Sequence, residues 1–248
     1  MGADIHLAAK RVWLKIIGLE ILLMFFYMVN GAFVSIMNPT HPVLQFIGLI
    51  PLAIGVFLYL LFKKKWDVYF FTRFFPLSKQ YIPLVVVLLI IVIGNKGLDT
   101  SSFAHLFFMF LMQLFIVAFI EETFFRGFML KLVLPKGKAM AVLLTSFLFG
   151  ITHSIQLFGG QSIEDTILQI IYAFIVGLVL SLLIVTNHSI LATITFHGFN
   201  NFFNFMGNTE SHNIFAYLII IILIGYSFFL WNLMTKPVDT RKDQFFLG

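Results

Sequence analysis

Long runs of apolar residues, separated by short polar or turn-forming stretches, dominate the pattern along the chain. An α-helix rises about 1.5 Å per residue, so about 20 apolar residues cross the roughly 30 Å hydrocarbon core of a bilayer. Candidate membrane-spanning runs cover residues 12–37, 43–62, 81–93, 102–131, 139–157, 163–185, 188–205 and 213–234. The pattern predicts an all-α polytopic membrane protein with about eight transmembrane helices. Because the third run is short and the seventh contains several polar residues, seven helices are an alternative.

Composition supports the same class. Hydrophobic residues make up 60% of the 248 positions and charged residues 11%, and the mean hydropathy is +1.00. Soluble domains average about 45–50% apolar and about 25% charged residues. A water-soluble globule is therefore excluded, and membrane lipids are the expected surroundings. The absence of cysteine excludes disulfides, thiolate metal sites and a cysteine nucleophile.

The formal charge of +5 does not favour a nucleic-acid partner, because the basic residues lie at the ends of apolar runs. With eight helices, most of them fall on one side of the membrane: Lys10, Arg11, Lys15, Lys63, Lys64, Lys65, Arg73, Lys79, Lys131, Lys136, Lys138, Lys236, Arg241 and Lys242. The positive-inside rule then predicts cytoplasmic N- and C-termini.

Away from its ends, the run 102–131 contains three charged residues, Glu121, Glu122 and Arg126. A charge at the centre of a membrane helix costs about 2.5–3.5 kcal/mol on insertion scales, so these residues need a partner or a function. Glu122 and Arg126 are four residues apart and can form an ion pair on one helical face. Glu121 is rotated by about 100° and is left without that partner.

Two later runs carry His153 and the pair His197 and Asn201. Each histidine by itself could serve only as a hydrogen bonder between helices. Counted from the cytoplasmic ends, however, Glu121, His153, His197 and Asn201 all lie at depths of about 14–22 Å. We therefore expect these four side chains to meet in one layer.

An acid, two imidazoles and an amide offer two kinds of hydrolytic chemistry. Glu121 could act as a general base toward water while the other groups stabilise an oxyanion. Alternatively, Glu121, His153 and His197 could bind zinc with an open fourth position. The residues alone leave both possibilities open, although H-E-x-x-H, a pair of membrane aspartates and G-x-S-x-G are all absent from the sequence.

The ordered motifs E-E-x-x-x-R, F-x-x-x-H and H-x-x-x-N begin at Glu121, Phe149 and His197. This order resembles the CPBP family of CAAX prenyl endopeptidases and bacteriocin-processing proteins, whose bacterial members are also called Abi or lysostaphin-resistance-A-like proteins. The resemblance divides the chain into N-terminal transmembrane helices (1–101), a peptidase core (102–206), and a last transmembrane helix with a cytoplasmic tail (207–248).

The resemblance implies an eight-helix intramembrane endopeptidase that uses glutamate-activated water and no metal cofactor. Glu121 then corresponds to the catalytic glutamate and His153 to its water-activating partner. His197 and Asn201 correspond to the oxyanion-stabilising pair, with Glu122 and Arg126 as supports.

The leading hypothesis is an endopeptidase of the cell membrane, of the bacterial plasma membrane in particular, that a membrane-associated peptide or protein enters from the cytoplasmic side. Its role would be peptide maturation or bacteriocin self-immunity. The alternative is a non-catalytic immunity or scaffold protein that regulates a partner. A proton-coupled transporter ranks below both, because no internal repeat is visible.

Overall fold

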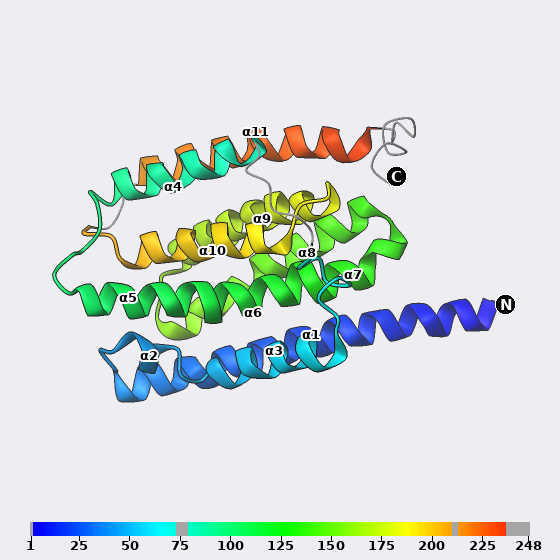
Figure 1. The fold of residues 1–248 in the computed structure, drawn as a ribbon, viewed down its shortest axis with the longest axis horizontal. Helices are drawn as coiled ribbons and strands as arrows, with labels where there is room; N and C mark the ends of the chain where they lie inside the picture. Colours follow the sequence, from blue (N-terminus) through cyan, green and yellow to red (C-terminus); the bar gives the residue numbers. More distant parts are fainter. Residues whose placement is uncertain (1, 73–78, 210–212, 237–248) are drawn as a thin grey trace.

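The computed structural model of the chain describes residues 2–72, 79–209 and 213–236, and these ranges are helical apart from their connections (Figure 1). They contain no strand, although an antiparallel bridge joins Leu98 to Gly207. The principal helices are α1 (Gly2–Met37), α3 (Ile50–Lys63), α4 (Ile82–Gly94), α8 (Lys138–Thr152), α9 (Ile163–Val185), α10 (Ile190–Phe205) and α11 (Asn213–Thr235). Short segments α2 (Pro42–Gln45) and η1 (Lys79–Tyr81) precede α3 and α4.

The predicted run 102–131 forms one long helical element with a changing hydrogen-bond pattern. Its parts are α5 (Phe103–Leu111), η2 (Met112–Ala118), α6 (Phe119–Glu122), η3 (Thr123–Met129), α7 (Leu130–Val133) and η4 (Leu134–Lys136). The segments η2 and η3 are π-helical, so the single α-helical turn that carries both glutamates lies between two π segments. Such interruptions of an α-helix occur frequently at functional sites.

Each of the eight predicted runs coincides with helical structure, which confirms the all-α class. Among the described residues, five helical stretches are long and apolar enough to cross a membrane: Lys10–Met37, Phe103–Lys136, Lys138–Gly159, Ile163–Val185 and Ile214–Thr235. Ile50–Lys63 and Lys79–Gly94 are shorter apolar helices. The chain is therefore a multi-pass membrane protein. The count of eight spans and the cytoplasmic termini stay predictions, and Arg73, Arg241 and Lys242 lie outside the described residues.

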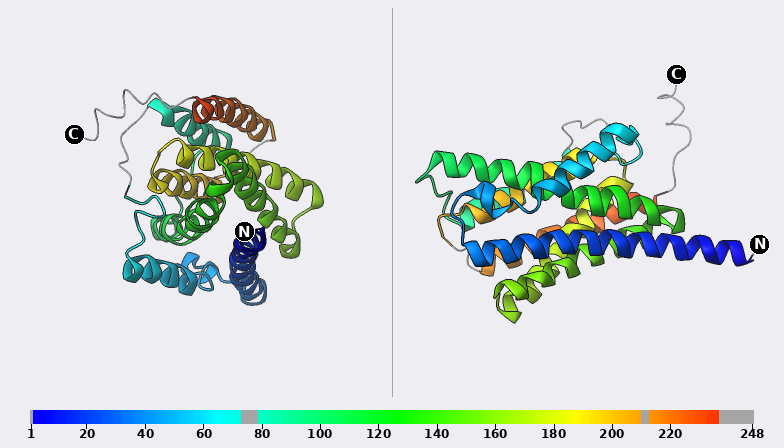
Figure 2. Two further views of the ribbon diagram at one scale, coloured as in Figure 1. Left: turned by 90° about the vertical axis from the view of Figure 1, so that its right-hand side faces the viewer. Right: turned by 90° about the horizontal axis from the view of Figure 1, so that it is seen from below.

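The helices form a bundle in which α9 and α10 are internal. Helices α4 and α11 lie along one side of the bundle and α1 and α3 along the opposite side, with α5–α7, α8, α9 and α10 between them (Figures 1 and 2). The most apolar 18-residue stretch of α9 is 56% buried, against 11% for that of α1. The catalytic candidates therefore lie on inner helices, while α1 borders them from outside.

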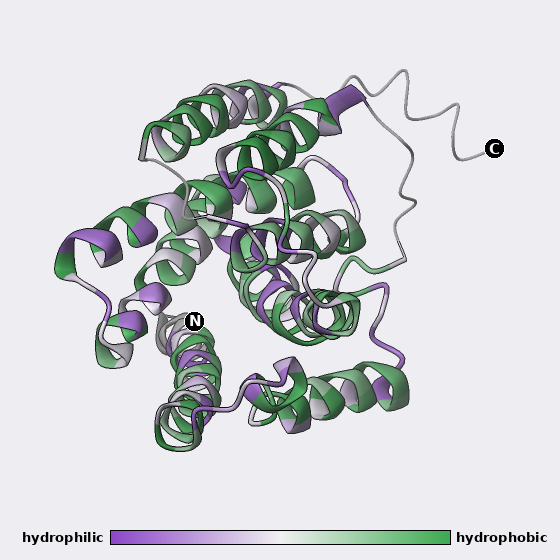
Figure 3. Ribbon diagram, turned by 90° about the vertical axis from the view of Figure 1, so that its left-hand side faces the viewer, coloured by the Kyte–Doolittle hydropathy of each residue, from purple (hydrophilic) through white to green (hydrophobic). Residues whose placement is uncertain are grey.

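The outer helical surfaces are apolar, as a lipid environment requires. Large hydrophobic side chains such as Ile21, Phe57, Ile93 and Phe228 are exposed. Hydrophobic residues run along most of every long helix, and hydrophilic residues gather mainly in connections and at helix ends (Figure 3). Without water to satisfy the backbone, the spanning segments must form their hydrogen bonds internally, which helices do.

Candidate active site

The two adjacent glutamates at the end of α6 are both buried but face different neighbours. Glu122 is fully buried, and the side chain of Glu121 is 11% exposed. Glu122 contacts Arg126 and His197, whereas Glu121 contacts Tyr27 and lies beside His197. One helical turn therefore presents two carboxylates to two separate environments.

Glu122 and Arg126 form the expected ion pair. The Arg126 Nη1 donates to Glu122 Oε1 at 2.9 Å, and both side chains are completely buried. The guanidinium lies over the ring of Phe149, 4.2 Å from its centroid. Gly177 makes room for it, since a Cβ there would lie 3.2 Å from Arg126 Nη2. Aromatic and backbone surfaces thus enclose a charge that lipid could not solvate.

His197 lies between the two glutamates. Its Nδ1 is 2.8 Å from Glu122 Oε1, and its Nε2 is 3.6 Å from Glu121 Oε2. An ionised carboxylate only accepts hydrogen bonds, so Nδ1 carries the proton in that contact. The second nitrogen then faces Glu121 across a gap that one bridging water could close.

The close approach of α10 to η2 sets the position of His197. Gly198 is the next residue, and a Cβ on it would lie 3.0 Å from the Cα of Leu114 and 2.7 Å from its Cδ1. Only glycine allows the two backbones to come so near. This packing holds the imidazole against α6.

Tyr27 of α1 donates its phenolic hydrogen to Glu121 Oε1. Glu121 Oε2 is left facing His197. Sequence reasoning did not identify Tyr27, because an aromatic residue within an apolar run gives no separate signal. Glu20, seven residues earlier on α1, accepts a hydrogen bond from Thr152 Oγ1 at 2.5 Å and so links α1 to α8.

His153 lies where α8 gives way to the 3₁₀ segment η5 (His153–Gly159). Its Nδ1 is 2.8 Å from the carbonyl oxygen of Phe149. Because a carbonyl can only accept, Nδ1 is the donor and the neutral ring offers Nε2 as an acceptor. The ring of Phe149 packs edge-on against both His153 and His197, with centroid distances of 5.0 and 5.6 Å.

A polar cavity of about 640 Å³ adjoins these residues. His153, His197 and Asn201 line it, whereas Glu121 lies next to the cavity, behind His197, and is not one of its lining residues. The layer expected from helix depth therefore places three of the four predicted groups on one cavity and the fourth beside it. Asn200 was not predicted, yet it also lines the cavity.

Carboxamides are the commonest polar groups of that lining: Asn95, Gln156, Gln161, Gln169, Asn200, Asn201 and Asn204. Asn200 accepts a hydrogen bond from the hydroxyl of Tyr172 at 2.5 Å and donates to Asn201 Oδ1 at 3.3 Å. These contacts orient Asn201. Amide groups both donate and accept, so the cavity suits a ligand that does the same.

The alternative zinc set does not gather around a common point. Within the described ranges, no group of three or more His, Asp or Glu side chains could hold a metal ion. His153 Nδ1 is directed to a backbone carbonyl, while His197 Nδ1 is directed to Glu122. We therefore derive no chemical step from a metal.

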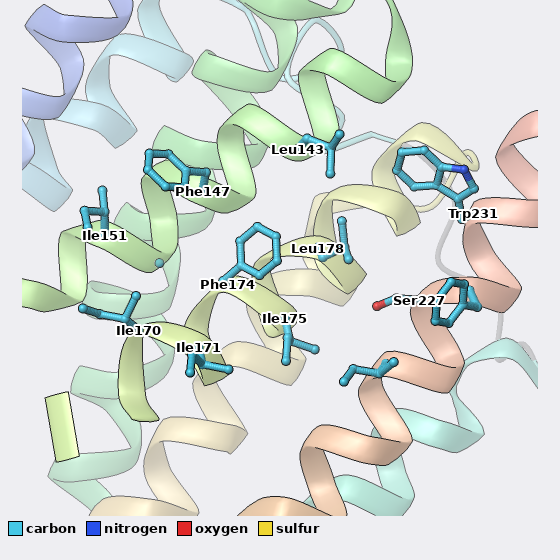
Figure 4. Close-up of a pocket in the computed structure, with 13 residues that line it drawn as sticks. Leu143, Phe147, Ile151, Ile170, Ile171, Phe174, Ile175, Leu178, Ser227 and Trp231 are labelled. Carbon is cyan, nitrogen blue, oxygen red and sulfur yellow. The ribbon is translucent and has the colours of Figure 1, made fainter. Parts of the chain in front are cut away.

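A second cavity, of about 590 Å³, lies between α8, α9 and α11 (Figure 4). Its lining is apolar except for Ser227, whose hydroxyl donates to the Leu223 carbonyl at 2.8 Å. It contains no titratable side chain. Of these two cavities, the polar one is therefore the one that titratable side chains line.

Fold and site together define a multi-pass membrane protein with an acid–imidazole cluster beside a polar cavity inside its bundle. Residues 103–203 match the family described as type II CAAX prenyl endopeptidase Rce1-like, which is a protease family. The matched segment begins with α5 and ends within α10, so it contains every predicted site residue. This match confirms the resemblance to the CAAX proteases. No curated protein and no solved structure gives a significant match to the chain.

Proposed function

We propose that the chain is an intramembrane endopeptidase in which Glu121 activates water to hydrolyse a peptide bond of a membrane-associated peptide or protein. The observation that carries this proposal is the position of His197, which contacts the Glu122 carboxylate, faces Glu121 and lines the polar cavity. An acid and an imidazole at the wall of a cavity can act on a peptide bond inside it.

In the first step, Glu121 takes a proton from water as the water oxygen attacks the carbonyl carbon of the scissile bond. Tyr27 occupies Glu121 Oε1, so Oε2 is the oxygen free for this proton. The second hydrogen of this water donates a hydrogen bond to His153 Nε2, which orients the water. The product of this step is a tetrahedral intermediate with a negative oxygen.

In the second step, the intermediate collapses and the carbon–nitrogen bond breaks. The proton held by Glu121 passes to the leaving nitrogen, which yields an amine and a carboxylic acid. His197 and Asn201 donate hydrogen bonds to the oxyanion meanwhile, for which His197 carries a proton on each ring nitrogen. The Glu122 carboxylate accepts a hydrogen bond from Nδ1 and so fixes the orientation of the ring.

The cavity lining suits a polypeptide substrate. The side chains of Gln156, Gln161 and Gln169 line it and form no hydrogen bond within the described ranges. Free carboxamides can bind the alternating N–H and C=O groups of an extended peptide without requiring a particular sequence. In this proposal the protein acts in a bacterial plasma membrane, on peptide maturation or bacteriocin self-immunity.

The direct test is cleavage of a defined probe by the purified protein in proteoliposomes. The probe is an internally quenched farnesylated peptide that ends in a Cys-aliphatic-aliphatic-X sequence, with an unprenylated copy for comparison. We expect the parent chain to cleave at least one probe, and Glu121→Ala and His153→Ala to lose at least about 100-fold in kcat. Glu164→Ala, at an exposed position in the first turn of α9, is the matched control. Parent-level cleavage by both site variants would refute the proposal.

A non-catalytic scaffold is the competing function. The observation in its favour is the buried network of Arg126, Glu122 and His197, which links the long helix to α10. That function requires the fold but not the Glu121 carboxylate. An isosteric Glu121→Gln exchange would then leave cellular function intact, whereas a peptidase would lose it.

A further inference from the structure

The polar cavity is most deeply buried around His197 and most exposed at its far end. His197 is 3% exposed and its neighbour Asn200 is 5% exposed. By contrast, Asp165, Asn204 and Phe205 line the same cavity and are exposed, Phe205 to 61%. A ligand therefore reaches the acid–imidazole cluster past these three residues.

The open end lies at one end of the helical bundle. Asp165 is in the first turn of α9, and Asn204 and Phe205 are in the last turn of α10. In Figure 1, α10 ends and α11 begins at the end of the bundle opposite the one where α1 begins and α11 ends. The cavity mouth therefore faces away from the start of α1 and the end of α11.

The basic residues gather at the other end of the bundle. They occur where α1 begins, where α3 and the long helix end, and where α8 begins: Lys10, Arg11, Lys15, Lys63, Lys64, Lys65, Lys131, Lys136 and Lys138. Near the mouth stand Asp99, Glu164, Asp165 and, in the described residues, one cation, Lys96. The positive-inside rule assigns the lysine-rich end to the cytoplasm.

From these two observations we propose that the substrate enters from the non-cytoplasmic face of the membrane. The substrate class is then a peptide segment exposed on the outer surface, such as a secreted peptide or an external loop of a membrane protein. The substrate class rests on the proposed peptidase function. The side of the membrane on which the cavity opens does not depend on catalysis. This inference replaces the expectation of access from the cytoplasm.

The lining adds a preference within that class. Asp165 is the only side chain of the lining, apart from the two histidines, that can carry a charge. The Asp165 carboxylate would repel an acidic substrate side chain near the mouth and attract a basic one. Substrate segments with neutral or basic side chains are therefore favoured.

The chain contains no cysteine, so single cysteines can report access on an otherwise unreactive background. Asp165→Cys and Asn204→Cys probe the mouth, and Lys65→Cys and Lys138→Cys probe the basic end at equally exposed positions. A membrane-impermeant maleimide is applied to intact cells, to permeabilised cells and to detergent-denatured protein. Labelling of the denatured protein normalises each variant for its amount.

We expect the mouth cysteines to react in intact cells at least about tenfold faster than the basic-end cysteines, which react after permeabilisation. Faster labelling at the basic end, equal labelling of both ends, or no labelling of the mouth cysteines in intact cells would overturn the inference. The labelling experiment needs no substrate, so it tests the access route even if the protein cleaves neither peptide probe. A failure to cleave would count against the peptidase function and not against the access route.

Discussion

The two neighbouring glutamates of α6 have different surroundings, and the proposed function assigns a structural role to one and a catalytic role to the other. Glu122 is completely buried, and Arg126 and His197 both bond to its Oε1. Glu121 is buried except for 11% of its side chain, and its Oε2 lies 3.6 Å from His197 Nε2. The first carboxylate is committed to its partners, and the second retains an oxygen for chemistry.

This difference teaches that charge inside a membrane protein does not by itself indicate catalysis. A buried ion pair costs several kcal/mol of desolvation per ion, which good geometry and further hydrogen bonds must offset. The Glu122–Arg126 pair has the His197 imidazole and the Phe149 ring as further contacts, while Glu122 Oε2, Arg126 Nε and Arg126 Nη2 have no hydrogen-bond partner within the described residues. A catalytic carboxylate instead needs an oxygen that is free to act on a substrate, and the proposed function gives that role to Glu121 Oε2, which lies 3.6 Å from the cavity-lining His197.

Of the changes considered, breaking the buried Glu122–Arg126 ion pair should lower the stability of the protein most. We expect Arg126→Met to lower the free energy of unfolding by about 3–5 kcal/mol, because Glu122 loses its cation in a buried site. The double variant Glu122→Gln with Arg126→Met should lose less, since no lone charge remains. Reversible denaturation in mixed micelles measures both, and Lys138→Met, at an exposed position, is the control. A double variant less stable than Arg126→Met would contradict this account.

Displacing α10 should move His197 away from Glu121 and lower the rate of cleavage. Gly198→Ala places a methyl group against the backbone of Leu114, so α10 must move and carry His197 away from Glu121. Misplacement by about 1 Å can reduce rates about 100-fold, and we expect a fall in kcat of that order. Gly225→Ala is the matched control, because no atom lies within 4 Å of its added Cβ. Equal kcat values for the two variants would show that this contact does not position the site.

Removing the Tyr27 hydroxyl should affect Glu121 and leave the Glu122–Arg126 ion pair unchanged. Tyr27→Phe keeps the ring but loses the hydrogen bond to Glu121, and we expect kcat to fall about tenfold with KM unchanged. The control Tyr59→Phe removes a hydroxyl that is 3.3 Å from Tyr69 Oη, outside the site. A rise in KM without a fall in kcat would assign Tyr27 to substrate binding instead of to the positioning of Glu121.

The sequence was sufficient for the features that have a strong physical signal. Apolar runs located the helices, and the four-residue spacing located the Glu122–Arg126 pair. Helix depth also placed His153, His197 and Asn201 on a common cavity. Each of these features depends on spacing within one helix or on length, and both can be counted along the chain.

Features that depend on helix rotation could not be read in this way. Tyr27 contacts Glu121 across 94 positions of sequence, and no spacing within α1 indicates that contact. The π segments η2 and η3 change the direction in which side chains of the long helix point. The α-helical rotation of about 100° per residue therefore does not predict these directions across them.

The most direct test of the central claim sets two isosteric exchanges side by side, Glu121→Gln and Glu122→Gln, with kcat and thermal midpoint measured for each on the same probe. We predict that Glu121→Gln loses about a thousandfold in kcat while its midpoint stays within about 2 °C of the parent, and that Glu122→Gln is strongly destabilised. Cleavage by Glu121→Gln at the parent rate would contradict the assignment of Glu121 as the base.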